Sequence, residues 1–256
     1  MKEKIFGLPL ELYHNRGLIL TLAKNDFKTK YAGSYLGIVW AFIQPIVTIM
    51  VYWFVFTVGL KAGDMAEYPF VLYLISGIVP WFFFQDALNA GTNGLIEYNY
   101  LVKKVVFKIS ILPMVKVISA LFVHVFFVAF ALVVCAANGY PPTIHTIQII
   151  YYTGCTFVFS LALVYITSAV VIFFRDLTQI SIFLQVGIWL TPIMWDLGRM
   201  ADHPLFVKAF KLNPMYYIVS GYRDSILGRV WLTDHLKWGL YFWCVTIVLF
   251  VLGTVI

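Results

Sequence analysis

Charge is what this sequence has least of. Only 12% of its 256 residues are Asp, Glu, Lys or Arg, against about 25% in an ordinary soluble domain. Hydrophobic residues make up 62%, and the mean hydropathy is +0.88. This composition excludes an ordinary cytosolic enzyme, a disordered tail and a nucleic-acid-binding domain, and it predicts a polytopic membrane protein.

Cysteine and catalytic patterns are also scarce. Cys135, Cys155 and Cys244 lie inside apolar runs, and their spacing fits neither a disulfide framework nor a metal site. We interpret them as small apolar packing residues. No Ser-His-Asp arrangement, metal-ligand spacing or paired carboxylates emerge, so the sequence gives no support for catalysis or for a bound metal.

Two further absences concern energy. The sequence has no Gly-x-x-x-x-Gly-Lys-Ser/Thr phosphate loop, so this chain cannot bind ATP in that way. The expected spans contain no Asp or Glu, the carboxylates on which proton and sodium relays depend. Any energy source therefore belongs to a partner, and we expect no cofactor in this chain.

Long uncharged stretches mark the expected membrane spans, because a helix needs about 20 apolar residues to cross the hydrocarbon core. The turn formers of the segment 138–142 break the longest stretch into two. We predict one all-α transmembrane domain, 1–256, with six spans at 36–58, 68–85, 113–136, 146–173, 177–195 and 238–256. The last span ends without the basic residues usual at a cytoplasmic end, as in a truncated chain.

Basic residues are distributed unequally between the two sides of these spans. With the N-terminus inside, eleven of the 18 Lys and Arg residues fall in inner segments and seven in outer ones. This bias predicts a cytoplasmic N-terminus. The first residues do not form a signal peptide.

Two cytoplasmic segments have patterns of their own. Residues 10–31 are predicted to form an amphipathic helix, either in the membrane interface or packed on another cytoplasmic element. The inner loop 86–110 joins apolar residues to a basic cluster at Lys103 and Lys104. Positive-inside anchoring explains the lysines but not the apolar residues of the same loop. The sequence therefore favours a surface that binds a partner.

The outer loop 196–237 contains one helix signal. Asn213 and Pro214 are typical of a helix start and Gly228 of a helix stop. The helix between them is too short to cross, so we expect it to dip into the outer leaflet and return. Arg223 and Asp224, near its end, are expected at the outer surface.

Polar residues recur every three or four positions on the first and fifth spans. Because lipid cannot satisfy an amide, Gln44 and Gln185 are expected to face protein or a wet pathway. Helix packing and a pathway both explain these stripes. Of two polar groups in the third span, Lys116 is expected to snorkel and His124 to be a packing residue rather than a ligand. The aromatic residues fit interfacial belts or a channel that passes a glycan.

Four segments in order resemble the ABC-2 type permeases that export polysaccharides. They are DFKTKYAGSYLG at 26–37 with Trp40 and Gln44-Pro45, LVKKVVF at 101–107, FFRDL at 173–177, and LNPM at 212–215 leading to YRD at 222–224. The family often has proline after the phenylalanine of the second segment, where Lys108 stands here. Wall teichoic acid permeases are the most similar, and O-antigen and capsule permeases share most of the features.

The resemblance implies a bacterial plasma membrane protein and a homodimer that binds two ATP-binding subunits. ATP and Mg²⁺ would sit on those subunits. The implied substrate is a polymer on a polyprenyl diphosphate. Resemblance to the wall teichoic acid permeases implies wall teichoic acid, with O-antigen or capsule polysaccharide as the alternative. Besides membrane lipid, no other ligand and no nucleic acid is implied.

Roles follow from this resemblance and from the stripes. Lys28 and Lys30 are expected to attract the lipid diphosphate by charge. The expected pathway residues are Tyr35, Trp40, Gln44, Thr48, Gln185 and Trp189. The expected contacts that couple the chain to the ATPase are Gly94, Leu95, Ile96, Glu97, Tyr98, Lys103, Lys104 and Arg175. The outer re-entrant region is represented by Asn213, Pro214, Arg223 and Asp224.

Two other functions compete with this interpretation. A small-molecule or drug exporter of the same family would have the same topology. A scramblase or a membrane enzyme acting on polyprenyl lipids would need no ATP, although the missing intramembrane acids argue against the enzyme.

Overall fold

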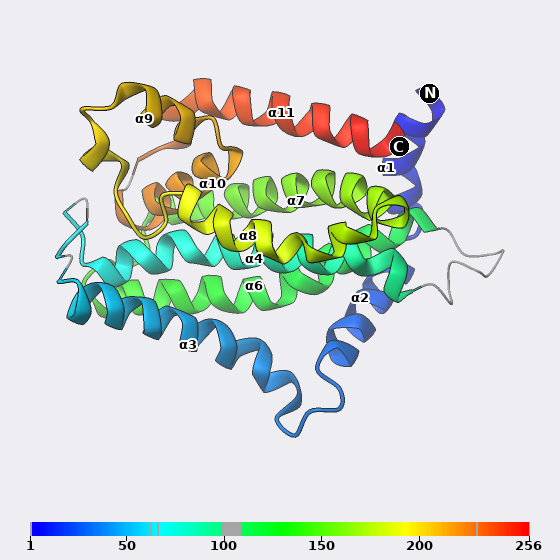
Figure 1. Ribbon diagram of the computed structural model, residues 1–256, viewed down its shortest axis with the longest axis horizontal. Helices are drawn as coiled ribbons and strands as arrows, with labels where there is room; N and C mark the ends of the chain where they lie inside the picture. The colour runs from blue at the N-terminus through cyan, green and yellow to red at the C-terminus, as the bar shows by residue number, and fades with distance from the viewer. Residues whose placement is uncertain (1, 62, 66, 99–108, 229, 256) are drawn as a thin grey trace.

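The computed structural model describes residues 2–61, 63–65, 67–98, 109–228 and 230–255 and is a bundle of α-helices (Figure 1). Within these ranges five helices are long and apolar enough to cross a membrane. They are built on α3 (Trp40–Phe54, extended by η1, Gly37–Val39, and η2, Val55–Gly59), α4 (Phe70–Glu97), α6 (Leu112–Ala137), α7 (Gln148–Phe173) and α11 (Leu236–Val255).

Shorter helical segments join and flank the long ones. At the end of the bundle that is predicted to face outward they are η4 (Ile144–Ile147), η6 (Leu197–Met200), α9 (Pro204–Lys211), α10 (Pro214–Arg223), η7 (Asp224–Gly228) and η8 (Leu232–His235). At the other end of the bundle lie α1 (Lys2–His14), α2 (Arg16–Lys30), η3 (Ile109–Ile111) and η5 (Arg175–Gln179), from which α8 (Ile180–Leu190) departs.

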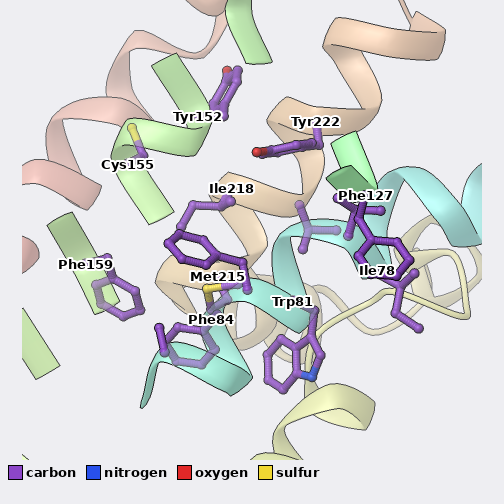
Figure 2. Packing of buried hydrophobic residues seen from close by; sticks show 14 of the residues in the cluster. Ile78, Trp81, Phe84, Phe127, Tyr152, Cys155, Phe159, Met215, Ile218 and Tyr222 are labelled. Atoms are coloured by element: carbon purple, nitrogen blue, oxygen red, sulfur yellow. The ribbon is translucent and has the colours of Figure 1, made fainter. Parts of the chain in front are cut away.

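Helix α4 forms the centre of the bundle. It packs against α6, α7 and α10, and 78% of its most apolar window is buried, compared with 11% for α3. The approach to α7 is close, because a Cβ at Gly91 would lie 2.5 Å from the side chain of Val164. Figure 2 shows Phe84 of α4, Phe159 of α7 and Met215 of α10 in one apolar cluster.

The expected fifth span, 177–195, is not one long helix. The 3₁₀ segment η5 is followed by α8, whose 11 residues rise only about 16 Å. Thr191 has an extended backbone, as residues before proline usually do, and this ends the helix. Even so, η5 and α8 run back along the bundle, and the two chain termini lie at the same end (Figure 1). The chain therefore passes along the bundle six times, once through a broken helix.

The second span is longer than predicted. Helix α4 continues from the expected end at residue 85 to Glu97 and takes up half of the expected inner loop 86–110. Ala87, Leu88, Gly91 and Thr92 of this extension are buried. Packing on the neighbouring helices therefore keeps helical a stretch that the sequence pattern places in a loop.

The N-terminal helix starts earlier than predicted. In place of one helix over 10–31, α1 and α2 together cover residues 2–30, with an interruption at Asn15. Ile19 and Ala23 of α2 are buried, and α2 packs against α6. Helix α2 thus packs on a candidate membrane span rather than on a separate cytoplasmic element, while Leu18 and Leu20 are exposed.

The outer helix α10 starts where predicted, because the Asn213 Oδ1 accepts a hydrogen bond from the Met215 amide at 3.0 Å. Its apolar face packs on other helices of the chain. Met215, Ile218 and Val219 are buried, and α10 packs against α4 and α7. Figure 2 places Ile218 and Tyr222 inside the core.

Candidate functional site

A cavity of about 690 Å³ opens on one side of the bundle. Helices α3 and α8 form its two flanks, α4 and α6 form its floor, and the end of α2 lies at its mouth. The residues that line it are Lys30, Tyr31, Trp40, Ala41, Gln44, Pro45, Thr48, Tyr52, Val79, Phe82, Phe83, Gln85, Asp86, Asn89, Ala120, Val123, His124, Phe127, Gln185, Ile188 and Trp189.

Five of the six predicted pathway residues line this cavity. Trp40, Gln44 and Thr48 come from successive turns of α3, and Gln185 and Trp189 from successive turns of α8. Their four-residue spacing puts each set on one helix face. Tyr35 is different, because it lies in the turn before η1, is fully exposed and is not among the lining residues.

Helix α4 contributes residues that sequence reasoning missed. Gln85 and Asn89 lie four residues apart and line the floor beside Asp86. The pattern of amides at that spacing is visible in the sequence. The sequence pattern places residues 86–110 in a loop, and four-residue spacing defines a common face only in a helix. The amide spacing therefore does not identify Gln85 and Asn89 as lining residues from sequence.

The lining combines amides with aromatic rings and has little charge. Amides such as those of Gln44 and Gln185 both donate and accept hydrogen bonds, and ring faces suit apolar C–H groups. Among the described residues that line the cavity, Lys30 and Asp86 are the only ones of the types Lys, Arg, Asp and Glu. The one histidine in the lining is His124. The site can therefore contact a chain of hydroxyl groups without offering it a row of cations.

Lys30 and Asp86 form an ion pair at the mouth of the cavity. Burial alone would lower the pKa of Lys30, but the carboxylate of Asp86 outweighs it, so the pKa lies above its ordinary value. Lys30 is therefore a cation at every physiological pH. Lys28 is exposed and lies outside the cavity lining, so only one of the two lysines predicted to attract a diphosphate is at this mouth.

Lys116 does not snorkel, contrary to expectation. Its side chain is 7% exposed, and its Nζ lies 2.7 Å from Asp26 Oδ1 and 2.5 Å from Glu97 Oε2. The Tyr98 hydroxyl donates to the same Asp26 oxygen at 2.6 Å. Burial works to raise the pKa of Asp26, but the hydrogen bonds from Lys116 and Tyr98 outweigh burial and hold this pKa below its ordinary value. We call these four residues the Lys116 cluster.

The predicted coupling residues fall into three groups. Gly94, Glu97 and Tyr98 contact Lys116, since a Cβ at Gly94 would lie 3.1 Å from the lysine Cγ. Leu95 is half-buried, and Ile96 and Arg175 are exposed on the same end of the bundle. Lys103 and Lys104 lie outside the described residues.

His124 packs as predicted, although it also lines the cavity. Its Nε2 lies 2.9 Å from the Tyr222 hydroxyl and 3.3 Å from the Thr153 hydroxyl, and its ring stacks on Phe83. Because Tyr222 belongs to α10, this contact joins the cavity floor to the outer helix through a hydrogen bond.

Arg223, predicted at the outer surface, is half-buried at the end of α10. Its Nη1 donates to the Pro192 carbonyl and its Nη2 to the Ile193 carbonyl, both at 2.7 Å, beyond the end of α8. Its guanidinium also lies 3.6 Å from the centre of the Tyr73 ring. Asp224 turns away and pairs with His235 at 3.1 Å. Arg223 therefore ties α10 to α4 and α8.

Comparison with known proteins extends this description. A family model described as "ABC-2 type transporter" matches residues 17–227. An O-antigen export system permease protein RfbA from Myxococcus xanthus is 31% identical over 214 residues, which are 83% of this chain and 81% of that protein. Two RfbA permeases from Klebsiella pneumoniae are 23% and 22% identical, over 86% and 87% of this chain and 86% of each of those proteins.

Proposed function

Because this chain belongs to the ABC-2 type transporter family, we propose that it is the membrane-spanning subunit of a bacterial exporter of lipid-linked, predominantly uncharged polysaccharide. The chain is a multi-pass permease, and the ATPase activity lies on a partner subunit. The finer steps, namely the polymer, the route and the homodimer, are our proposals.

The cavity is the observation that carries the choice of substrate. It has about 690 Å³ of space and a lining of amides, hydroxyls and rings, which suits sugar hydroxyls and the apolar faces of sugar rings. A teichoic acid carries a phosphate on each repeat and would be expected to meet unpaired Lys or Arg along its route. The one lysine among the lining residues is already paired with Asp86. This supports an O-antigen or capsule type of polymer over wall teichoic acid, the first expectation from sequence.

The mouth of the cavity suits the lipid end of such a substrate. Lys30 and the exposed Lys28 lie on α2, at the end of the bundle where the positive-inside bias places the cytoplasm. We propose that the diphosphate competes with Asp86 for Lys30, while the sugar chain enters between α3 and α8.

A second copy of the chain would close the cavity. Gln44, Gln185 and Trp189 line it and are exposed in the single chain, as are the apolar Met50, Phe183 and Val186 on the same two helices. Amides exposed at membrane depth need partners other than lipid. We therefore propose a homodimer whose two cavities meet across α3 and α8, with two ATP-binding subunits at the end that carries Arg175.

The test is ATPase stimulation in nanodiscs that contain this chain and its co-expressed ATP-binding subunit. We expect a lipid-linked uncharged polysaccharide to stimulate hydrolysis, and the double variant Gln44→Leu/Gln185→Leu to lose that stimulation. Asn138→Leu, at an exposed amide outside the cavity and at the other end of the bundle from Arg175, is the control and should behave as wild type.

Each competing function has its own outcome in this assay. Stimulation by a lipid-linked polyol phosphate alone would indicate that the substrate is wall teichoic acid. Stimulation by small amphiphiles alone would indicate a drug exporter. Lipid-linked glycan that crosses without ATP would indicate a scramblase.

A further inference from the structure

The Lys116 cluster is unusual because one buried ammonium meets three separate elements. Lys116 belongs to α6, its partner Asp26 to α2, and its partner Glu97 to the last turn of α4. Asp26 and Glu97 are 71 positions apart, and among the described residues Lys116 is the cation that forms an ion pair with each of them. Among the described residues, Lys116 is therefore the one cation that pairs with both helix ends, beside a direct hydrogen bond from the Tyr98 hydroxyl to Asp26.

Fold stability alone is a weak reason for such an arrangement. Removing charges from water costs more than many buried ion pairs return, and apolar residues of similar size often stabilise a fold better. What an ion pair supplies is a defined geometry, because the carboxylates and the ammonium must stay within hydrogen-bonding distance. The Asp26 carboxylate accepts from both Lys116 and Tyr98, so its position is determined from α6 and from the end of α4 at once.

Lys116 forms two ion pairs, one with Asp26 and one with Glu97, which we call the two arms of the cluster. They connect to different parts of the molecule. Glu97 and Tyr98 end α4 and precede the segment that is proposed to face the ATP-binding subunit. Asp26 lies four residues before Lys30, one helical turn along α2, and Lys30 reaches the cavity mouth. A displacement of the α4 end would thus be passed through Lys116 to the helix that carries the substrate-facing lysine.

We propose that Lys116 is a positioning residue for transport, a joint that makes the end of α4 and helix α2 move together. This rests on the proposed function in taking the end of α4 as the side that faces the ATPase. Lys116 itself touches neither substrate nor nucleotide. Cutting either ion pair weakens the connection between the cavity mouth and the end of α4, which then depends on the Tyr98–Asp26 hydrogen bond and the Lys30–Asp86 ion pair.

Two conservative variants cut one arm each. Asp26→Asn removes the charge that holds α2 and leaves Lys116 paired with Glu97, whereas Glu97→Gln leaves Lys116 paired with Asp26. We expect each to lose polysaccharide stimulation of ATPase, measured per assembled complex in nanodiscs. Because both ion pairs run through Lys116, the double variant should be no worse than Asp26→Asn alone, which also weakens the Tyr98 hydrogen bond. Asp234→Asn, an exposed carboxylate on the outer side, is the control and should keep full stimulation.

Amide hydrogen exchange supplies a readout that does not depend on transport. Lys116→Met should speed exchange both in α2 and in the last turn of α4, and so should Asp26→Asn, which also weakens the hydrogen bond from Tyr98. Glu97→Gln should speed exchange in the last turn of α4 alone. A merely local role for each carboxylate would give additive losses of stimulation. Loosening of only one of the two segments by Lys116→Met would show that the lysine does not join them. Either result would contradict the proposal that Lys116 couples α2 to the end of α4.

The two proposals fail in different ways. A wild-type complex that does not respond to any lipid-linked polysaccharide contradicts the proposed function, and hydrogen exchange then still decides whether Lys116 links α2 to α4. Normal stimulation in Asp26→Asn and in Glu97→Gln contradicts the joint and leaves the proposed function standing.

Discussion

At the scale of single residues, the buried cations depend on partners far away in the chain. Lys116 finds carboxylates on α2 and α4, and Arg223 finds two backbone carbonyls about 30 positions away. Both were expected to reach water, because a lone cation in an apolar stretch has no visible partner in the sequence. Long-range contacts of this kind decide whether a charge is buried.

The two lysines of α2 should differ in their effect on transport. We expect Lys30→Gln to raise the concentration of lipid-linked polysaccharide that half-stimulates ATPase by about tenfold, as for one lost hydrogen bond to a charged group. Lys28→Gln is expected to stay within about twofold, because an exposed charge contributes little. The measurement is a titration of ATPase rate in nanodiscs.

One control separates the lysine from its partner. Lys30→Gln leaves Asp86 unpaired, so the double variant Lys30→Gln/Asp86→Asn is measured beside it. If the double variant recovers wild-type affinity, the effect came from the free carboxylate and not from a lost contact with diphosphate. Equal effects of Lys28→Gln and Lys30→Gln would assign the attraction to the helix as a whole.

At the scale of elements, α10 is the clearest difference between sequence and structure. Its start and its N-cap follow from Asn213 and Pro214, but its surroundings are protein rather than lipid. A Cβ at Gly221 would lie 2.1 Å from the Tyr152 ring of α7, so the two helices are in direct contact there. This contact, the Arg223 hydrogen bonds and the Tyr222–His124 hydrogen bond hold α10 against the bundle.

A pair of glycine variants tests this packing. Gly221→Ala must displace the Tyr152 ring or α10 itself, and we expect it to destabilise the protein by about 1–3 kcal/mol. Gly154→Ala, in the same pair of neighbouring helices, meets nothing within 4 Å and should be neutral or stabilising by up to about 1 kcal/mol. Thermal unfolding in detergent measures both, and equal melting temperatures would contradict the close contact.

At the scale of the whole molecule, the path of the chain matters more than the number of long helices. Five helices are long enough to span, yet both termini lie at one end of the bundle, which requires an even number of passes. The broken pass through η5 and α8 accounts for the sixth. It also leaves α8 short and polar on the side that lines the cavity, where a wet surface is available.

Thiol labelling tests this path. In a Cys244→Ser background, we expect Asn25→Cys and Asp176→Cys to react with a membrane-impermeant reagent only after the membrane is opened, and Asp202→Cys to react in intact cells. Asp176 and Asp202 are exposed and flank the broken pass. Labelling of both from the same side would mean that η5 and α8 return without crossing, and labelling of Asn25→Cys in intact cells would reverse the orientation.

The sequence by itself determined the features that depend on local composition and spacing. Apolar runs marked the five long helices to within a few residues, except at the end of α4 and in the broken fifth pass, and four-residue spacing identified the lining of α3 and α8. The absence of a phosphate loop assigned ATP hydrolysis to a partner. These inferences hold because hydrophobic length and helical periodicity are properties of short segments.

Only the tertiary structure decided which polar groups meet. It extended α4 to Glu97, packed α10 against α4 and α7, held Arg223 half-buried against the Pro192 carbonyl, and placed Lys116 between Asp26 and Glu97. It also showed that Lys30, and not Lys28, lies at the cavity mouth. Pairing of buried charges depends on which helices are neighbours, and helix neighbours are set by packing across the whole bundle rather than by the pattern along any one segment.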